Sequence, residues 1–220
     1  MPSGKRNKPR PHNTRRAGTK FSNKLSDRLL FAGFIFIGLS LALFGAVFWP
    51  VLREEIGYRL RKHVAPNTQS RPITPASEAF GIVIPKIGAN AKVIADVNPF
   101  DSNEYQRALT RGVAHAKGSA KPGSNGNIFL FSHSSVNFYE AARFNSVFYL
   151  INKLNEHDPI DLYYNGAQFR YTVTKKQMVS PTSIQFMLPK SIGAETLTLM
   201  TCWPPGTTQK RLLIIAERLP

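Results

Sequence analysis

The sequence contains a single cysteine, Cys202, among 220 residues. No disulfide can therefore form within the chain, and Cys202 is either a buried bystander or a free reactive thiol. The sequence also lacks an internal repeat and a glycine-rich phosphate-binding motif, which argues against a repeat architecture and against a nucleotide site of that kind. Any chemistry that the chain performs has to come from side chains of other types.

Charged residues are missing from residues 29–52, which are rich in Leu, Phe, Ile, Gly and Ala. As a helix this stretch is about 36 Å long, enough for a hydrocarbon core of about 30 Å. The apolar part of a signal peptide is shorter, and no small-residue cleavage site follows here. A buried helix of a soluble protein would normally have a polar face. The pattern predicts one transmembrane helix over residues 29–52.

Acidic residues are nearly absent before this helix: residues 1–28 hold nine Lys or Arg and one Asp. Nucleic-acid binding is one interpretation of such a tail. Beside a membrane span, the positive-inside rule instead predicts a basic cytoplasmic tail and an extracytoplasmic remainder. Residues 53–78 are interpreted as a juxtamembrane segment and Pro-rich linker, and residues 79–220 as one extracytoplasmic domain. A free thiol is at risk in an oxidising compartment, which favours a reactive role for Cys202.

The domain shows many short strand patterns and no alternation of strands with long helices. Asn165-Gly166, between residues 159–164 and 168–173, predicts a type I′ hairpin. Apolar residues at 3–4 spacing from Phe144 to Leu154 predict a short amphipathic helix. Residues 99–107 are expected to form a turn or another short helix. These features indicate a mainly β fold, a closed or nearly closed barrel with one or two short helices.

The cysteine ends a strand pattern over residues 195–203, in which Thr196, Thr198, Met200 and Cys202 are expected to share one face. Pro204-Pro205-Gly206 then predicts a turn, and residues 210–216 a second strand. If these strands pair as an antiparallel hairpin, Arg211 returns close to Cys202.

A cysteine with an ordinary pKa of about 8.5 is mostly protonated at neutral pH, so a nucleophilic cysteine requires a base or a nearby positive charge. Of five histidines, only His115 and His133 are flanked by apolar strand patterns, and His133 directly follows the strand pattern of residues 127–132. A histidine in that position is more often structural than catalytic. Its catalytic role depends on convergence with Cys202 and Arg211, because thiol, acid/base and oxyanion donor are the parts of an acyl-transfer site.

Thr198-Leu199-Met200-Thr201-Cys202 matches the TLxTC signature of sortases, the membrane-bound cysteine transpeptidases of Gram-positive cell surfaces. Arg211 matches their catalytic arginine, and the segment from Asn127 to His133 resembles the one that carries their catalytic histidine. Ile84-Pro-Lys-Ile-Gly88 looks like their first-strand motif. The resemblance covers about residues 80–219 and implies a closed eight-stranded β-barrel.

The resemblance to sortases further implies that Cys202 cleaves an LPxTG-like sorting signal between Thr and Gly through a thioacyl enzyme. An amine of a peptidoglycan precursor or a pilin lysine would then receive the acyl group. His133 would transfer protons, and Arg211 would hold the substrate carbonyls and stabilise the oxyanion. Thr201, Trp203 and three residues of the preceding connection, Ile184, Phe186 and Leu188, are candidate substrate contacts, although a core or loop-anchoring role for the last three is equally open.

Some features depart from the family pattern. Phe131-Ser132 stands before His133 where many sortases have a small residue and a glycine. Nothing over residues 79–111 resembles the lid of pilin-building sortases, and no second span follows the domain, so a single-anchor, housekeeping-like arrangement is expected. Asp101, Glu104 and Glu140 are too scattered to predict a calcium site, and no cofactor is expected.

Two other functions fit the sequence less well. A cell-wall L,D-transpeptidase would need a glycine-rich Ser-x-Gly-Cys-type motif that the residues around Cys202 do not supply. A catalytically silent barrel that serves as a surface binding module would have lost one of the three catalytic residue types, all of which are present.

Overall fold

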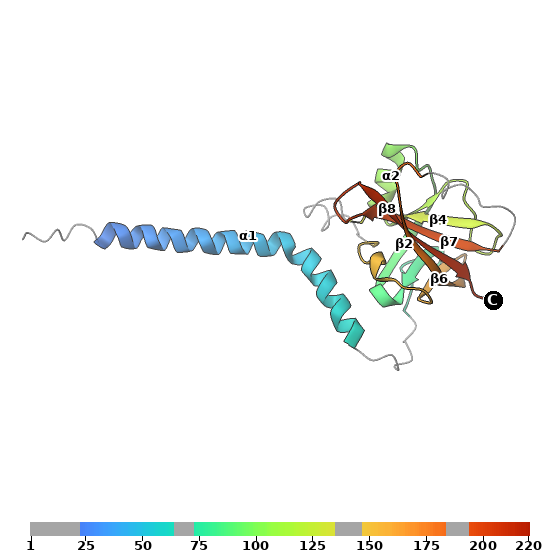
Figure 1. Ribbon diagram of the computed structural model, residues 1–220, viewed down its shortest axis with the longest axis horizontal. Coiled ribbons are helices and arrows are strands. Elements are labelled where there is room, and N and C mark those ends of the chain that lie inside the picture. Colours follow the sequence, from blue (N-terminus) through green and yellow to red (C-terminus); the bar gives the residue numbers. More distant parts are fainter. Residues whose placement is uncertain (1–22, 64–72, 135–146, 184–193) are drawn as a thin grey trace, which may run out of the picture. The chain divides into compact units, whose positions relative to one another are not determined.

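The computed structural model describes residues 23–63, 73–134, 147–183 and 194–220. It contains one long N-terminal helix, α1 (Asn23–His63), and a β-barrel (Figure 1). The part of α1 long and apolar enough to cross a membrane is Ser26–Ala46, with a mean hydropathy of 2.4. Its large apolar side chains are exposed, for example Phe34 at 71%. The predicted span and the first part of the predicted juxtamembrane segment, as far as His63, thus belong to one helix.

Eight strands close into a barrel in the order β1-β2-β3-β4-β7-β8-β6-β5. The pairs β2–β3 and β4–β7 are parallel and the other six are antiparallel. Closure leaves no unpaired sheet edge. The strands are β1 (Phe80–Ile84), β2 (Ala89–Val97), β3 (Val113–Ala116), β4 (Asn127–Phe131), β5 (Pro159–Tyr164), β6 (Ala167–Val179), β7 (Thr196–Trp203) and β8 (Lys210–Arg218).

The β5–β6 hairpin has the predicted two-residue turn. Tyr164 pairs with Ala167, and the two residues between them, Asn165 and Gly166, have φ angles of 51° and 79°. Positive φ at both positions is what a type I′ turn requires, and Asn-Gly adopts it at low cost. The sequence prediction of this hairpin is confirmed.

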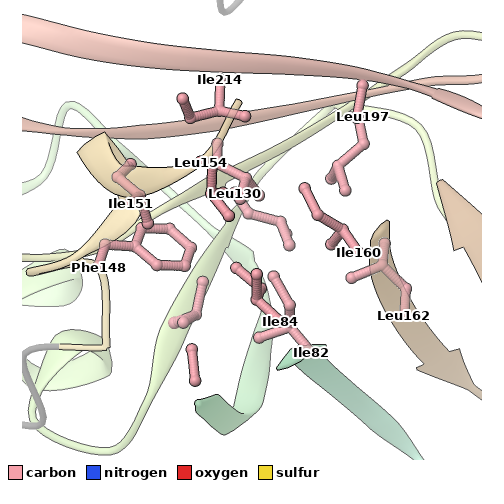
Figure 2. Close-up of a cluster of buried hydrophobic side chains, with 14 of the residues drawn as sticks. Ile82, Ile84, Leu130, Phe148, Ile151, Leu154, Ile160, Leu162, Leu197 and Ile214 are labelled. Carbon is pink, nitrogen blue, oxygen red and sulfur yellow. The ribbon is translucent and has the colours of Figure 1, made fainter. Parts of the chain in front are cut away.

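The barrel interior is filled by aliphatic and aromatic side chains from all around the sheet (Figure 2). On β7 the inward residues are Leu197 and Leu199, which alternate with outward residues as the strand period requires. Figure 2 shows ten of the buried side chains by name: Ile82, Ile84, Leu130, Phe148, Ile151, Leu154, Ile160, Leu162, Leu197 and Ile214.

A second apolar cluster lies on the outer face of the barrel, where helix α2 (Ser102–Leu109) packs on it. Asp101 caps this helix by accepting hydrogen bonds from the N–H groups of Asn103 (2.9 Å) and Glu104 (3.1 Å). The cluster comprises Ile94, Val97, Tyr105, Ala108, Leu109, Ala114, Ala116, Phe129, Phe131 and Met200. In this cluster, apolar side chains of α2 pack against apolar side chains on the outer faces of β2, β3, β4 and β7.

Residues 113–116, for which the sequence pattern predicted no strand, form β3 between β2 and β4. One local prediction was wrong. The described part of the segment expected as an amphipathic helix is a turn followed by the 3-10 helix η2 (Ile151–Lys153). Its apolar residues, among them Phe148 and Leu154, are buried as anticipated, but Leu154 is already extended and ends the helix after one turn.

Candidate active site

Cys202 and Arg211 face each other across the β7–β8 hairpin. The two residues are paired Cα partners in the antiparallel register, followed only by Trp203 and Lys210 before the turn. Directly opposed residues of antiparallel strands point to the same side of the sheet. The register therefore places the thiol and the guanidinium on one face, as the hairpin pattern predicted.

The face that carries Cys202 is the outer one. Leu199 and Thr201, which alternate with it, are 0% and 2% exposed, and Leu199 belongs to the interior core. Met200, two residues before Cys202, packs in the outer cluster under α2. Cys202 itself is half-buried. The thiol thus stands just beyond the rim of an apolar patch, accessible yet partly shielded from water.

His133 is brought to this place by the parallel pairing of β4 with β7. Phe131 pairs with Met200, and the Ser132 N–H donates to the Met200 carbonyl oxygen over 3.2 Å. The Thr201 hydroxyl donates to the Ser132 carbonyl oxygen over 2.9 Å. These contacts extend the register by one residue, so His133, half-buried, follows at the level of Cys202. Three neighbouring strands thus contribute one candidate residue each.

The Arg211 side chain is anchored at the turn between β7 and β8. Its Nη1 donates to the carbonyl oxygens of Thr208 (3.2 Å) and Lys210 (3.3 Å). The turn itself contains the cis peptide Trp203–Pro204 and Gly206 with a φ of 80°. A fixed guanidinium with several N–H groups is suited to binding carbonyl oxygens or a developing oxyanion.

Two buried hydroxyl groups flank His133. Ser132 is 6% exposed and Ser134 2% exposed, and their Oγ atoms have no hydrogen-bond partner among the described residues. Ser132 is also the residue that departs from the glycine found in many sortases. The bonds that the structure does give Ser132 are made by its backbone, to Met200 and Thr201.

The other predicted substrate contacts have different positions. Thr201 is buried and holds the end of β4 through the hydrogen bond to Ser132. Trp203 is half-buried and packs against the interior core. Ile184, Phe186 and Leu188 lie outside the described residues. Substrate contact remains a prediction for all five.

No group of three or more His, Cys, Asp or Glu side chains that could hold a metal ion is found within the described ranges. Asp101 caps α2, and the Glu104 carboxylate accepts from the Asn98 N–H (2.9 Å). Glu140 lies outside the described residues.

His115, the other histidine in an apolar setting, is fully buried away from Cys202. Its Nδ1 accepts a hydrogen bond from the Asp96 N–H (3.2 Å), and its Nε2 lies 2.9 Å from both the Ala120 carbonyl oxygen and the Ser119 hydroxyl. An accepting Nδ1 leaves the proton on Nε2, which donates to Ala120. Burial lowers the pKa of His115 below its usual 6.5. This histidine is a structural element of the fold.

Glu195, just before β7, forms a buried polar network that the sequence pattern did not reveal. Its carboxylate accepts from Arg218 Nη1 (2.7 Å), the Gly123 N–H (3.1 Å) and the Tyr171 hydroxyl. The network joins β6, β8 and the β3–β4 loop to the start of β7. It lies at the end of β7 opposite to Cys202.

The structure defines a closed barrel with a half-buried thiol, an arginine and a histidine at the ends of adjacent strands, an arrangement suited to cysteine acyl-transfer chemistry. The sortase domain profile matches residues 82–219, well over half of the chain. The chain therefore belongs to the sortase family.

Individual relatives agree with this assignment. Sortase D of Bacillus subtilis (strain 168) is 30% identical over 146 residues, which are 64% of this chain and 65% of the relative. The matched part thus spans just under two thirds of that relative's length. Sortase A from Corynebacterium diphtheriae has a similar structure, with a TM-score of 0.54 and 27% identity over 64% of this chain and 60% of its own. Sortase C-1 from Actinomyces oris gives a TM-score of 0.54 and 25% identity, covering 78% of this chain and 85% of the other.

Proposed function

We propose that this chain is a membrane-anchored cysteine transpeptidase that cleaves an LPxTG-like sorting signal and transfers the acyl part to an amine. The observation that carries the proposal is the register of β4, β7 and β8. It brings His133, Cys202 and Arg211 to one level of three adjacent strands. Membership of the sortase family, shown over residues 82–219, supports the same reaction class.

In the proposed first step, the Cys202 thiol gives its proton to His133, and its sulfur attacks the carbonyl carbon of the signal's threonine. A tetrahedral oxyanion forms, and Arg211 donates N–H groups to it. The C–N bond to glycine then breaks, and His133 returns the proton to the departing amine nitrogen. The products are a thioester on Cys202 and a free glycine amine.

In the second step, an amine nitrogen attacks the thioester carbon while His133 accepts its proton. The C–S bond breaks, the new amide leaves, and the thiolate of Cys202 recovers a proton from His133. Each step forms one bond to the acyl carbon and breaks another, so no cofactor is needed. The acceptor amine belongs to a peptidoglycan precursor or to a pilin lysine.

The Ser26–Ala46 part of α1 supports a single-pass anchor by its length and hydropathy. The basic residues of the N-terminal tail place that tail in the cytoplasm by the positive-inside rule. The barrel then works outside the membrane, where sorting signals and cell-wall amines are found. Protease accessibility of an N-terminal epitope in right-side-out membrane vesicles tests this orientation, since the proposal requires protection.

The experiment for the activity uses the full chain in detergent micelles with a panel of LPxTG-like peptides and a glycine or lysine amine. Mass spectrometry should show cleavage after Thr, a transfer product and an acyl adduct on Cys202. The Cys202→Ala variant serves as the control and should show none of these. Intact peptides in the presence of folded wild-type protein would favour the silent binding barrel instead.

A further inference from the structure

The outer face of the barrel carries a second row of residues beside the apolar cluster under α2. Within that cluster, Ile94 pairs with Ala114, Ala114 with Phe131, and Phe131 with Met200, across β2, β3, β4 and β7. Side chains two positions along a strand return to the same face. The row shifted by two residues toward the active-site end consists of Lys92, Gly112, His133, Cys202 and, through the β7–β8 register, Arg211.

Lys92 and Gly112 are close neighbours in the structure as well as in this register. A Cβ atom added to Gly112 would lie 2.2 Å from the Lys92 carbonyl oxygen. Gly112 is buried and has no side chain, so the backbones of β2 and β3 approach closely here, and Lys92 and His133 are the nearest side chains of the row on either side of it.

Lys92 is exposed, and within the described part of the chain its amine makes no salt bridge. Its neighbours on the strand, Ala91 and Val93, are buried in the interior core, so the Lys92 side chain points outward. An exposed amine without an acidic partner is free to bind an anion.

Charges around α2 and β2 are separated along the barrel. Asp96 lies toward the far end of β2 and is paired with Lys121 (2.9 Å). Asp101 and Glu104 lie at the start of α2, and both bind backbone N–H groups there. Among the described residues of α2, β2 and the link from α2 to β3, the exposed charges toward the active-site end are basic: Lys92, Arg107 in the last turn of α2, and Arg111 before Gly112.

We propose that Lys92 forms an acceptor subsite, which binds an anionic group, carboxylate or phosphate, carried by the amine that resolves the thioacyl enzyme. The inference rests on the proposed transpeptidase function. The connection that carries the candidate donor contacts Ile184, Phe186 and Leu188 follows Val179, which pairs with Arg211. The acceptor then approaches from the other side of His133, where Lys92 is the next side chain in the row.

The spacing suits a small acceptor. Three interstrand steps of about 4.8 Å separate Lys92 from Cys202, or roughly 14 Å between their Cα atoms. An extended lysine side chain covers about 6 Å of this distance. The anionic group is then roughly 8 Å from the reacting carbon, the length of an acceptor of two or three residues at about 3.5 Å each.

The test measures acceptor kinetics of the full chain in detergent, with the donor peptide that wild type cleaves. Two matched acceptor pairs differ only in charge: triglycine against triglycinamide, and 6-aminohexyl phosphate against 6-aminohexanol. Lys92→Gln should raise the KM of the charged acceptors about 3- to 10-fold and leave the uncharged ones unchanged. Donor hydrolysis without acceptor should also stay unchanged, because Lys92 does not contact the donor.

Two further variants sharpen the result. Lys92→Arg keeps the positive charge and should retain most of the charged-acceptor preference. Lys117→Gln removes an equally exposed lysine after β3, at the far end of the barrel, and should behave as wild type. Added salt should weaken the preference in wild type and leave Lys92→Gln unaffected.

The outcomes separate the two proposals. A Lys92→Gln effect confined to triglycine identifies a carboxylate acceptor, and one confined to 6-aminohexyl phosphate identifies a phosphate. Equal changes for charged and uncharged acceptors, or no change at all, would overturn the subsite while leaving the transpeptidase intact. Absence of any Cys202 adduct in wild type would remove the function and the subsite together.

Discussion

Removing the charge of Glu195 should destabilise the barrel without harming the chemistry at Cys202. The Glu195 side chain is 6% exposed and accepts from Arg218, Gly123 and the Tyr171 hydroxyl. In Glu195→Gln, one carboxylate oxygen becomes an NH₂ group that faces hydrogen-bond donors. The substitution keeps the shape of the side chain, so the loss reports on the polar network.

The size of the effect follows from the burial of the partners. Breaking a buried ion pair costs about 3–5 kcal/mol. The Arg218 side chain is 43% exposed and regains water, so about 2–4 kcal/mol is expected here. Tyr171→Phe removes one hydrogen bond to a charged group and should cost about 1.5–3 kcal/mol. Burial and the bond to Glu195 raise the pKa of Tyr171, so its hydroxyl is a donor at all ordinary pH values.

Thermal unfolding of the full chain in detergent, followed by intrinsic fluorescence, measures both variants. A loss of 2–4 kcal/mol corresponds to a fall in Tm of roughly 5–15 °C for a domain of this size. Glu217→Gln, on the neighbouring exposed position of β8, is the control and should shift Tm little. Glu195 and Cys202 are seven residues apart on one strand, or about 23 Å, so transfer by the folded variant should match wild type. An unchanged Tm, or lost activity at unchanged Tm, would refute the reasoning.

Three other results are expected. Cys202→Ala and Arg211→Ala should each abolish peptide transfer while the Tm is retained. Arg211→Lys should also be inactive, because a lysine lacks the two-pronged donor geometry of an arginine. Full activity of the lysine variant in the same mass-spectrometric assay would contradict the role of Arg211 in stabilising the oxyanion. Because the folded-state pKa of His115 is lowered, its stabilising effect is complete above pH 6.5 and declines as the pH falls below that value. Urea unfolding between pH 7.5 and 5.5 should show this decline, and a His115→Gln variant with an equally steep profile would contradict it. Gly112→Ala should lower the urea concentration at the midpoint of unfolding, since the alanine Cβ would lie 2.2 Å from the Lys92 carbonyl oxygen. An unaltered midpoint would show that β2 and β3 can move apart at this point without loss of stability.

The sequence pattern predicted the elements that depend on local signals. Residues 210–216 lie in β8, Asn165-Gly166 turns the hairpin, and Arg211 pairs with Cys202. In each case alternation or turn chemistry acts over a few residues, so neighbours in sequence determine the structure. The proximity of Cys202 and Arg211 could be predicted because both residues lie on one hairpin.

Features that depend on distant partners were not predicted. β3 has only four residues, Val113–Ala116, and owes its strand structure to β2 and β4 on either side. Glu195 appeared as an ordinary acidic residue, because its partners come from residues 24 and 23 positions away along β6 and β8 and from the β3–β4 loop. The position of Lys92 in one row with Gly112 and His133 likewise requires the register of two strand pairs.

The order in which the strands are joined has a consequence for biosynthesis. β8 is the last strand to be made, and it closes the barrel by pairing with both β6 and β7. Arg211 is on that strand, and β7, which carries Cys202, pairs with β4 about 70 residues earlier in the chain. During synthesis, therefore, Cys202 emerges before Arg211. The two residues come to face each other only when the final strand has docked.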